Sequence, residues 1–164
     1  MTDNTQNSGA SNGAEAPPRE LGLHKTYIKD LSFESPAAPE IFRQAEFRPV
    51  TGVNLRTSHA EIEEGVYEVT ITITVDAKVE DETAFLVELE QSGIFIIRGY
   101  SDEERRIILG TWCPNTIFPF AREAIASAVQ RGGFPDLLIQ PVDFDTLFRK
   151  SMERQQQEQE AQSA

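Results

Sequence analysis

The chain has 164 residues, of which 27 are acidic and 15 are basic, so its formal net charge is −12. An estimated pI of 4.6 argues against nucleic acid as a partner, because phosphate groups would be repelled. The single cysteine excludes an internal disulfide and a cysteine-rich metal site. With no apolar run of about 18 residues and no secretory signal pattern, we expect a cytoplasmic protein without membrane insertion.

The length suggests one domain with a polar tail at each end. Residues 1–20 contain no valine, isoleucine, leucine or aromatic side chain and predict a disordered N-terminal tail. Residues 151–164 read as a polar C-terminal tail. The remaining segment, 21–150, is long enough to bury a core.

The first strand is expected from Leu21 to Glu34. One parity is largely apolar, and the other is largely polar. The apolar parity consists of Leu21, Leu23, Tyr27, Leu31 and Phe33. Prolines at positions 36 and 39 end the strand. The loop that follows carries Phe42 and Phe47, and two aromatic rings in a loop must rest on another part of the molecule.

Three more strands are expected, at about Val53–Ile62, at Val66–Val79 and from Thr83 onward. The middle one alternates strictly between apolar and polar residues, which predicts one packed face and one wet face. Nearly all of the net charge lies between Glu61 and Glu104, where 13 residues are acidic and two are basic. The wet face should therefore be acidic.

Helical patterns fill the rest of the chain. Asp102 begins one, and apolar spacing from Ala121 to Val129 followed by Gly132 indicates a second. Asp143 can cap a last helix, whose apolar stripe is Phe144, Leu147, Phe148 and Met152. Four strands followed by two main helices predict an α+β fold, with a four-stranded antiparallel sheet and the helices packed on one face.

No pattern indicates catalysis, so we expect no enzymatic activity and no metal. The two histidines lie on predicted strands without a nucleophile nearby. Cys113 lacks a second cysteine or a basic neighbour, which favours a buried structural thiol. Asp143 and Asp145 are better explained as a helix cap than as metal ligands.

Two features fit an ordinary fold less well. Leu86 lies on the polar parity of its strand beside Glu88, and Asp30 and Glu34 share the equivalent parity of the first strand. If the two strands are neighbours, these residues form an acidic patch with an apolar centre. The aromatic residues are also numerous for a domain with one helical layer, which indicates either a large core or an exposed apolar groove.

Several long motifs, in order and covering about residues 25–149, resemble the SecB family of bacterial protein-export chaperones. They are Tyr27-Ile28-Lys29-Asp30-Leu31-Ser32-Phe33-Glu34-Ser35-Pro36, Thr83-Ala84-Phe85-Leu86-Val87-Glu88, Gly93-Ile94-Phe95, Cys113-Pro114-Asn115-Thr116-Ile117-Phe118-Pro119-Phe120-Ala121-Arg122-Glu123, Gly132-Gly133-Phe134-Pro135 and Pro141-Val142-Asp143-Phe144-Asp145-Thr146-Leu147-Phe148. Phe47 stands where the family often has tryptophan.

The resemblance implies an ATP-independent holdase that binds unfolded precursor proteins and delivers them to the ATPase SecA. It implies a homotetramer built as a dimer of dimers, with no cofactor. The residues that contact SecA carry over to Asp30, Glu34, Leu86 and Glu88, and the partner segment is the basic, zinc-binding tail of SecA, so the zinc belongs to the partner. Clients are expected in an apolar groove at Phe42, Phe47, Phe85, Ile117 and Phe120.

Three alternatives remain open. A SecB-like chaperone that serves a toxin–antitoxin system would share the fold and the grooves. A small acidic enzyme of α+β fold would need a convergent polar cluster in a pocket. A binding domain for fatty or aromatic molecules would need a closed cavity.

Overall fold

Four long antiparallel strands form one sheet in the computed structural model, which describes residues 15–163. The strands are β1 (Glu20–Glu34), β2 (Val50–Glu63), β3 (Val66–Val79) and β4 (Glu82–Arg98), and their order in the sheet is β1-β4-β3-β2. The prediction of a four-stranded antiparallel sheet is confirmed. The disordered tail predicted for residues 1–20 lies largely outside the described residues.

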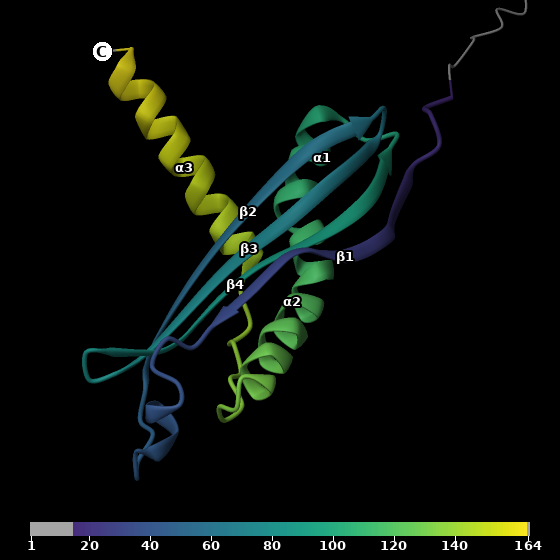
Figure 1. Ribbon diagram of the computed structural model, residues 1–164. Coiled ribbons are helices and arrows are strands. Elements are labelled where there is room, and N and C mark those ends of the chain that lie inside the picture. Colours follow the sequence, from purple (N-terminus) through teal and green to yellow (C-terminus); the bar gives the residue numbers. More distant parts are fainter. Residues whose placement is uncertain (1–14, 164) are drawn as a thin grey trace, which may run out of the picture.

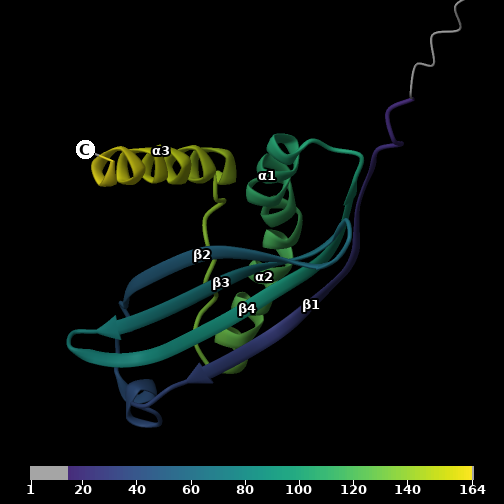
Figure 2. The same ribbon diagram turned by 90° about the horizontal axis from the view of Figure 1, so that it is seen from above.

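The helices follow the sheet in sequence and cover one of its faces (Figures 1 and 2). They are α1 (Asp102–Gly110), α2 (Trp112–Arg131) and α3 (Phe144–Gln162), and a short 3-10 helix, η1 (Glu40–Arg43), lies in the loop after β1. The long helix α2 packs against β3 and β4, whereas the C-terminal part of α3 projects away from the sheet (Figure 1). This confirms the α+β class.

Alternation along β3 and β4 builds the core, as the sequence predicts. The odd-numbered side chains of β3 from Val69 to Ala77 are fully buried, and the residues between them are more accessible or polar. Leu89 and Phe95 of β4 meet Ile117 and Ile125 of α2 in the same cluster. Cys113 is fully buried, and burial raises the pKa of its thiol to about 12, which agrees with a structural rather than a reactive role.

Two bulges in β1 correct the predicted faces of that strand. The pairing with β4 shifts by one residue between Leu23 and Lys25 and again between Ile28 and Asp30. Each shift moves the following side chains to the opposite face. Tyr27, expected on the apolar face, therefore lies on the open face of the sheet. The second shift restores the original parity, so Asp30 and the residues after it lie as predicted.

The helix ends follow local capping chemistry, with one difference from the expected boundaries. Ser101 and Glu104 form a reciprocal capping box at the start of α1, and Asp143 accepts a hydrogen bond from the Thr146 amide at the start of α3. Helix α2 begins at Trp112, nine residues before the expected apolar repeat, and contains Pro119. Helix α3 continues to Gln162 through side chains that are all exposed after Met152.

Candidate functional site

The first site lies on the open face of the sheet, where β1 and β4 pair. Glu34 is the pairing partner of Leu86, and Asp30 is the partner of Glu90. Glu88, between them on β4, pairs with Ser32. Asp30, Glu34 and Glu88 are exposed, and Leu86 is partly buried among them. The four residues Asp30, Glu34, Leu86 and Glu88, called the acidic patch below, are therefore brought together on one surface.

A further carboxylate borders this patch from the third strand. Asp76 of β3 is the pairing partner of Leu86, so Leu86 lies between Glu34 on one side and Asp76 on the other. Gly52 of β2 leaves the space that the Asp76 side chain occupies, because a Cβ at Gly52 would lie 2.5 Å from Asp76 Oδ1. Sequence reasoning identified Asp76 as a residue of the wet face but did not assign it to the patch.

The opposite half of the same open face carries charges that are paired with one another. The Glu68 carboxylate accepts hydrogen bonds from the Tyr27 hydroxyl and from Lys29 Nζ, the latter at 2.6 Å. These bonds lower the pKa of Glu68, with Lys29 as the larger cause. Burial and the bond to Glu68 raise the pKa of Tyr27 to about 12. Among the described residues, the acidic patch has no ion pair of this kind.

The second site is an aromatic cluster on the other face, at the same end of β1 and β4. Phe134, which follows α2, is its centre. The ring centroid of Phe134 lies 5.0 Å from that of Phe42, 5.4 Å from Phe47 and 4.9 Å from Phe85. Phe33 stacks on Phe85. Phe85 and Phe134 are buried, whereas Phe42 is 50% exposed and forms the accessible side of the cluster.

The other two residues expected in the client groove lie elsewhere. Ile117 is fully buried beneath β4, where its Cγ2 atom would lie 2.8 Å from a Cβ at Gly93. Phe120 is 47% exposed on α2. The structure therefore unites Phe42, Phe47 and Phe85 in one cluster. The client-binding roles of all five residues stay predictions.

An apolar groove that the sequence did not assign runs beside β2. It has a volume of about 550 Å³ and lies between Val53 and Leu55 of β2 and the extended segment that follows Phe134. The segment contributes Leu137, Leu138, Ile139 and Val142, and Leu138 is 67% exposed. The run of leucines was visible in the sequence, but nothing there indicated that it would face an edge strand.

The described residues contain no helix long and apolar enough to cross a membrane. In that same part of the chain, no three histidine, cysteine, aspartate or glutamate side chains come close enough together to hold a metal ion.

The sequence matches a known family over nearly its whole length. The family model described as "Preprotein translocase subunit SecB" matches residues 14–156. "Protein-export protein SecB" of Nitrosococcus oceani is 45% identical over 99% of this chain and 94% of that protein. The protein of the same name from Methylobacillus flagellatus is 49% identical over 82% of this chain and 85% of its own length.

A solved structure shares the fold at low sequence identity. It is the SecB-like chaperone of Mycobacterium tuberculosis in complex with a ChAD peptide from an antitoxin. The TM-score is 0.62 at 12% identity, and the match covers 75% of this chain and 91% of the other. At this identity the likeness concerns the fold alone.

Proposed function

The chain belongs to the SecB family of protein-export chaperones, and on this premise we propose that it holds unfolded precursor proteins in the cytoplasm without ATP or another cofactor and delivers them to SecA. Delivery requires that one molecule bind a client and a partner at the same time. The observation that supports the proposal best is the separation of two surfaces by the thickness of the sheet. Phe33 and Phe85 belong to the aromatic cluster, and the next residues, Glu34 and Leu86, belong to the acidic patch.

The acidic patch suits a basic segment such as the zinc-binding tail of SecA, the zinc being held by the partner. Exposed carboxylates attract a basic tail at long range, and salt weakens that attraction. Leu86 offers an apolar anchor that the tail can cover, and a desolvated contact of this kind contributes more affinity than charges at the rim.

The aromatic cluster suits unfolded clients because aromatic side chains bury a large area and accept varied partners. Phe42 is accessible, Phe47 is partly so, and the buried rings behind them hold both in position. The groove beside β2 offers further apolar surface. Many weak contacts of this type bind a chain without reading its sequence. The proposed function is binding, and catalysis has no part in it.

A homotetramer, arranged as a dimer of dimers, completes the proposal. Ile107 of α1 is 45% exposed and Trp112 of α2 is 37% exposed, and subunit contact would remove this apolar surface from water. We expect a mass near four times 18.4 kDa in light scattering. A monomer at micromolar concentration would contradict this part of the proposal.

The function is tested with two measurements on the pure protein. Light scattering of a chemically unfolded client follows aggregation with and without the chaperone, and calorimetry measures binding of the zinc-loaded C-terminal peptide of SecA. We expect suppression of aggregation and binding of the peptide that salt weakens. A chaperone that suppresses aggregation but does not bind the peptide would support the rival function in a toxin–antitoxin system, in which an antitoxin segment takes the place of SecA.

A further inference from the structure

A small cavity lies on the open face of the sheet, next to the acidic patch. Its volume is about 200 Å³, and residues from all four strands line it. Two of the lining residues, Asp30 and Glu88, belong to the acidic patch, whereas Arg56 comes from the edge strand β2. This cavity, called the open-face cavity below, therefore extends the surface of the patch across the sheet as far as β2.

The pairing register explains why a hollow forms at this point. One row of paired residues runs across the strands from β2 to β1, and it consists of Arg56, Thr72, Glu90 and Asp30. The neighbouring row consists of Asn54, Thr74 and Glu88. The two threonines on β3 have short side chains, and the charged side chains beside them are longer. The cavity therefore has a cation at its β2 end, carboxylates at its β4 and β1 end, and a polar floor between them.

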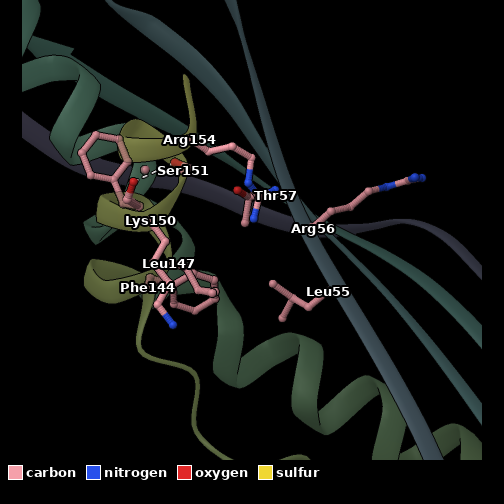
Figure 3. A pocket seen from close by; sticks show the side chains of 10 residues that line it. Leu55, Arg56, Thr57, Phe144, Leu147, Lys150, Ser151 and Arg154 are labelled. Carbon is pink, nitrogen blue, oxygen red and sulfur yellow. Dashed lines mark hydrogen bonds between the residues drawn. The ribbon is translucent and has the colours of Figure 1, made fainter. Parts of the chain in front are cut away.

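The Arg56 side chain is directed to the open side of the sheet. Figure 3 shows the space on the opposite side of β2, between that strand and the beginning of α3. Arg154 extends from α3 toward β2 in this view, whereas Arg56 points away from α3, past β2. Arg56 is exposed and forms no salt bridge within the described residues. Its guanidinium group is therefore available to a ligand on the open face.

The signs of the lining charges restrict which ligands fit the open-face cavity. The carboxylates of Asp30, Glu88 and Glu90 line it together with the guanidinium of Arg56. A free anion would be repelled by the carboxylates. A ligand with basic groups alone would bring a cation against Arg56, and like charges that meet in an interface are costly. The ligand that complements the whole cavity therefore carries a basic group and a carboxylate on the same chain.

The width of the sheet sets the spacing of these two groups. Neighbouring strands lie about 4.8 Å apart, so Arg56 on β2 and Asp30 on β1, with two strands between them, are separated by about 14 Å. An extended chain covers this distance in about four residues. A segment that crosses the strands with a basic group over the acidic patch therefore brings a residue about four positions away over Arg56.

We propose that Arg56 binds a carboxylate of the SecA tail and thereby fixes the register in which the tail lies on the sheet. This inference rests on the proposed delivery to SecA and adds a residue that determines specificity. The acidic patch attracts any basic segment and allows it to bind in several registers. Arg56 disfavours the registers that bring a basic group over β2 and favours the one that brings a carboxylate there.

A double-mutant cycle tests the pairing by calorimetry on the full-length chaperone and the zinc-loaded C-terminal peptide of SecA. In separate peptides, each acidic side chain is replaced by its amide, and amidation removes the charge of the C-terminal carboxylate. Arg56→Gln should weaken binding of the unmodified peptide by about threefold at low salt, as one exposed ion pair allows. The same substitution should no longer weaken binding of the one peptide that lacks the partner carboxylate.

Two further variants separate the pairing from net charge and from folding. Arg56→Lys keeps the positive charge and should bind the unmodified peptide more tightly than Arg56→Gln does. Lys150→Gln makes the same change in net charge as Arg56→Gln, but at an exposed position on α3, on the other side of β2. This control should bind every peptide as the parent protein does. Circular dichroism melting curves check that each variant folds, which the exposure of both positions favours.

The outcomes separate this inference from the function on which it rests. If Arg56→Gln binds the unmodified peptide more tightly than the parent does, Arg56 only repels the basic tail. If the affinity is unchanged, the guanidinium stays in solvent. A loss that is equal for every peptide of the cycle would show that Arg56 has no carboxylate partner in the tail. Each of these three results overturns the inference and leaves delivery to SecA intact. A parent protein that does not bind the unmodified peptide would overturn the proposed delivery, and this inference with it.

Discussion

The aromatic cluster and the acidic patch occupy the two faces of the same end of β1 and β4. Phe33 and Phe85 stack on the helix side, and Glu34 and Leu86, one residue further along each strand, pair on the open side. The cluster is packed and gains stability from burial. The patch has three exposed carboxylates without an ion pair among the described residues. The strand alternation therefore places the packed aromatic cluster and the exposed acidic patch back to back, one residue apart along each strand.

The largest expected effect separates the two faces by function. Asp30→Lys with Glu88→Lys should weaken binding of the SecA tail peptide by about a hundredfold, or about 3 kcal/mol, because like charges then meet at the interface. Suppression of client aggregation should be unchanged, since the aromatic cluster lies on the other face. Calorimetry and light scattering on the same variant check both statements. Equal loss of the two activities would mean that the faces are coupled or that the variant is misfolded.

The next effect concerns packing beneath the aromatic cluster. A Cβ at Gly132 would lie 2.1 Å from Cζ of Phe33. The backbone φ of Gly132 is −73°, a value that any residue can adopt. Gly132→Ala therefore tests steric crowding alone. We expect a loss of about 2 kcal/mol in the free energy of unfolding, measured in urea. Gly22→Ala is the matched control, because nothing lies within 4 Å of its Cβ position. A Gly132→Ala protein as stable as this control would show that the cluster is loosely packed.

A smaller effect concerns the accessible rings of the cluster. Phe42→Ser with Phe47→Ser should weaken client binding by about tenfold, because two aromatic contacts are lost while the buried rings stay in place. Binding of the SecA tail should not change. Phe120→Ser tests an exposed ring outside the cluster, and its affinity for clients shows whether Phe120 is a client contact. Undiminished client binding by the Phe42 and Phe47 variant would move the client site to the groove beside β2.

The sequence predicted the sheet, its wet face and the capped helices, because each rests on local periodicity or on hydrogen bonds a few residues apart. It also isolated Leu86, since a leucine among acidic neighbours breaks the alternation. The face of Tyr27 was wrong because two bulges in β1 have no marker in the sequence. Asp76 was missed for a related reason. A one-residue shift at Ala77/Lys78 sets its pairing with Leu86, and a turn signal alone does not reveal that shift.

The apolar groove beside β2 depends on contacts between distant segments. Leu138 and Val53 are 85 positions apart, and they line one groove only because the segment after Phe134 lies beside β2. Periodicity within one segment cannot predict such a meeting. The sequence therefore reveals the binding features that lie on one strand pair, and the structure is needed for those built between the sheet edge and the C-terminal segments.

The smallest expected effect compares a paired carboxylate with a free one on the same open face. Glu68 accepts hydrogen bonds from Lys29 and Tyr27, whereas Glu88 has neither an ion pair nor a side-chain hydrogen bond within the described residues. Glu68→Gln should therefore lower the free energy of unfolding at pH 7 by about 1 kcal/mol. Glu88→Gln should change it by less than about 0.5 kcal/mol. Urea unfolding of both variants measures the difference, and equal effects would contradict the distinction between the two halves of the face.

The pH dependence of the same variants gives an independent check. The hydrogen bonds, Lys29 first, lower the pKa of Glu68 in the folded protein. A carboxylate whose pKa is lowered by folding binds fewer protons in the folded protein than in the unfolded chain. Its contribution to stability is complete above the pKa of the unfolded chain, near 4.3. The contribution is lost as the pH falls through the pKa of the folded protein. The parent and Glu88→Gln should therefore lose this contribution on acidification below about pH 4.3. Glu68→Gln lacks the contribution at every pH, so the stability of the parent should converge with that of Glu68→Gln as the pH falls. Parallel stability curves of the parent and Glu68→Gln down to pH 3 would show that Glu68 stabilises the fold through its shape rather than through its charge.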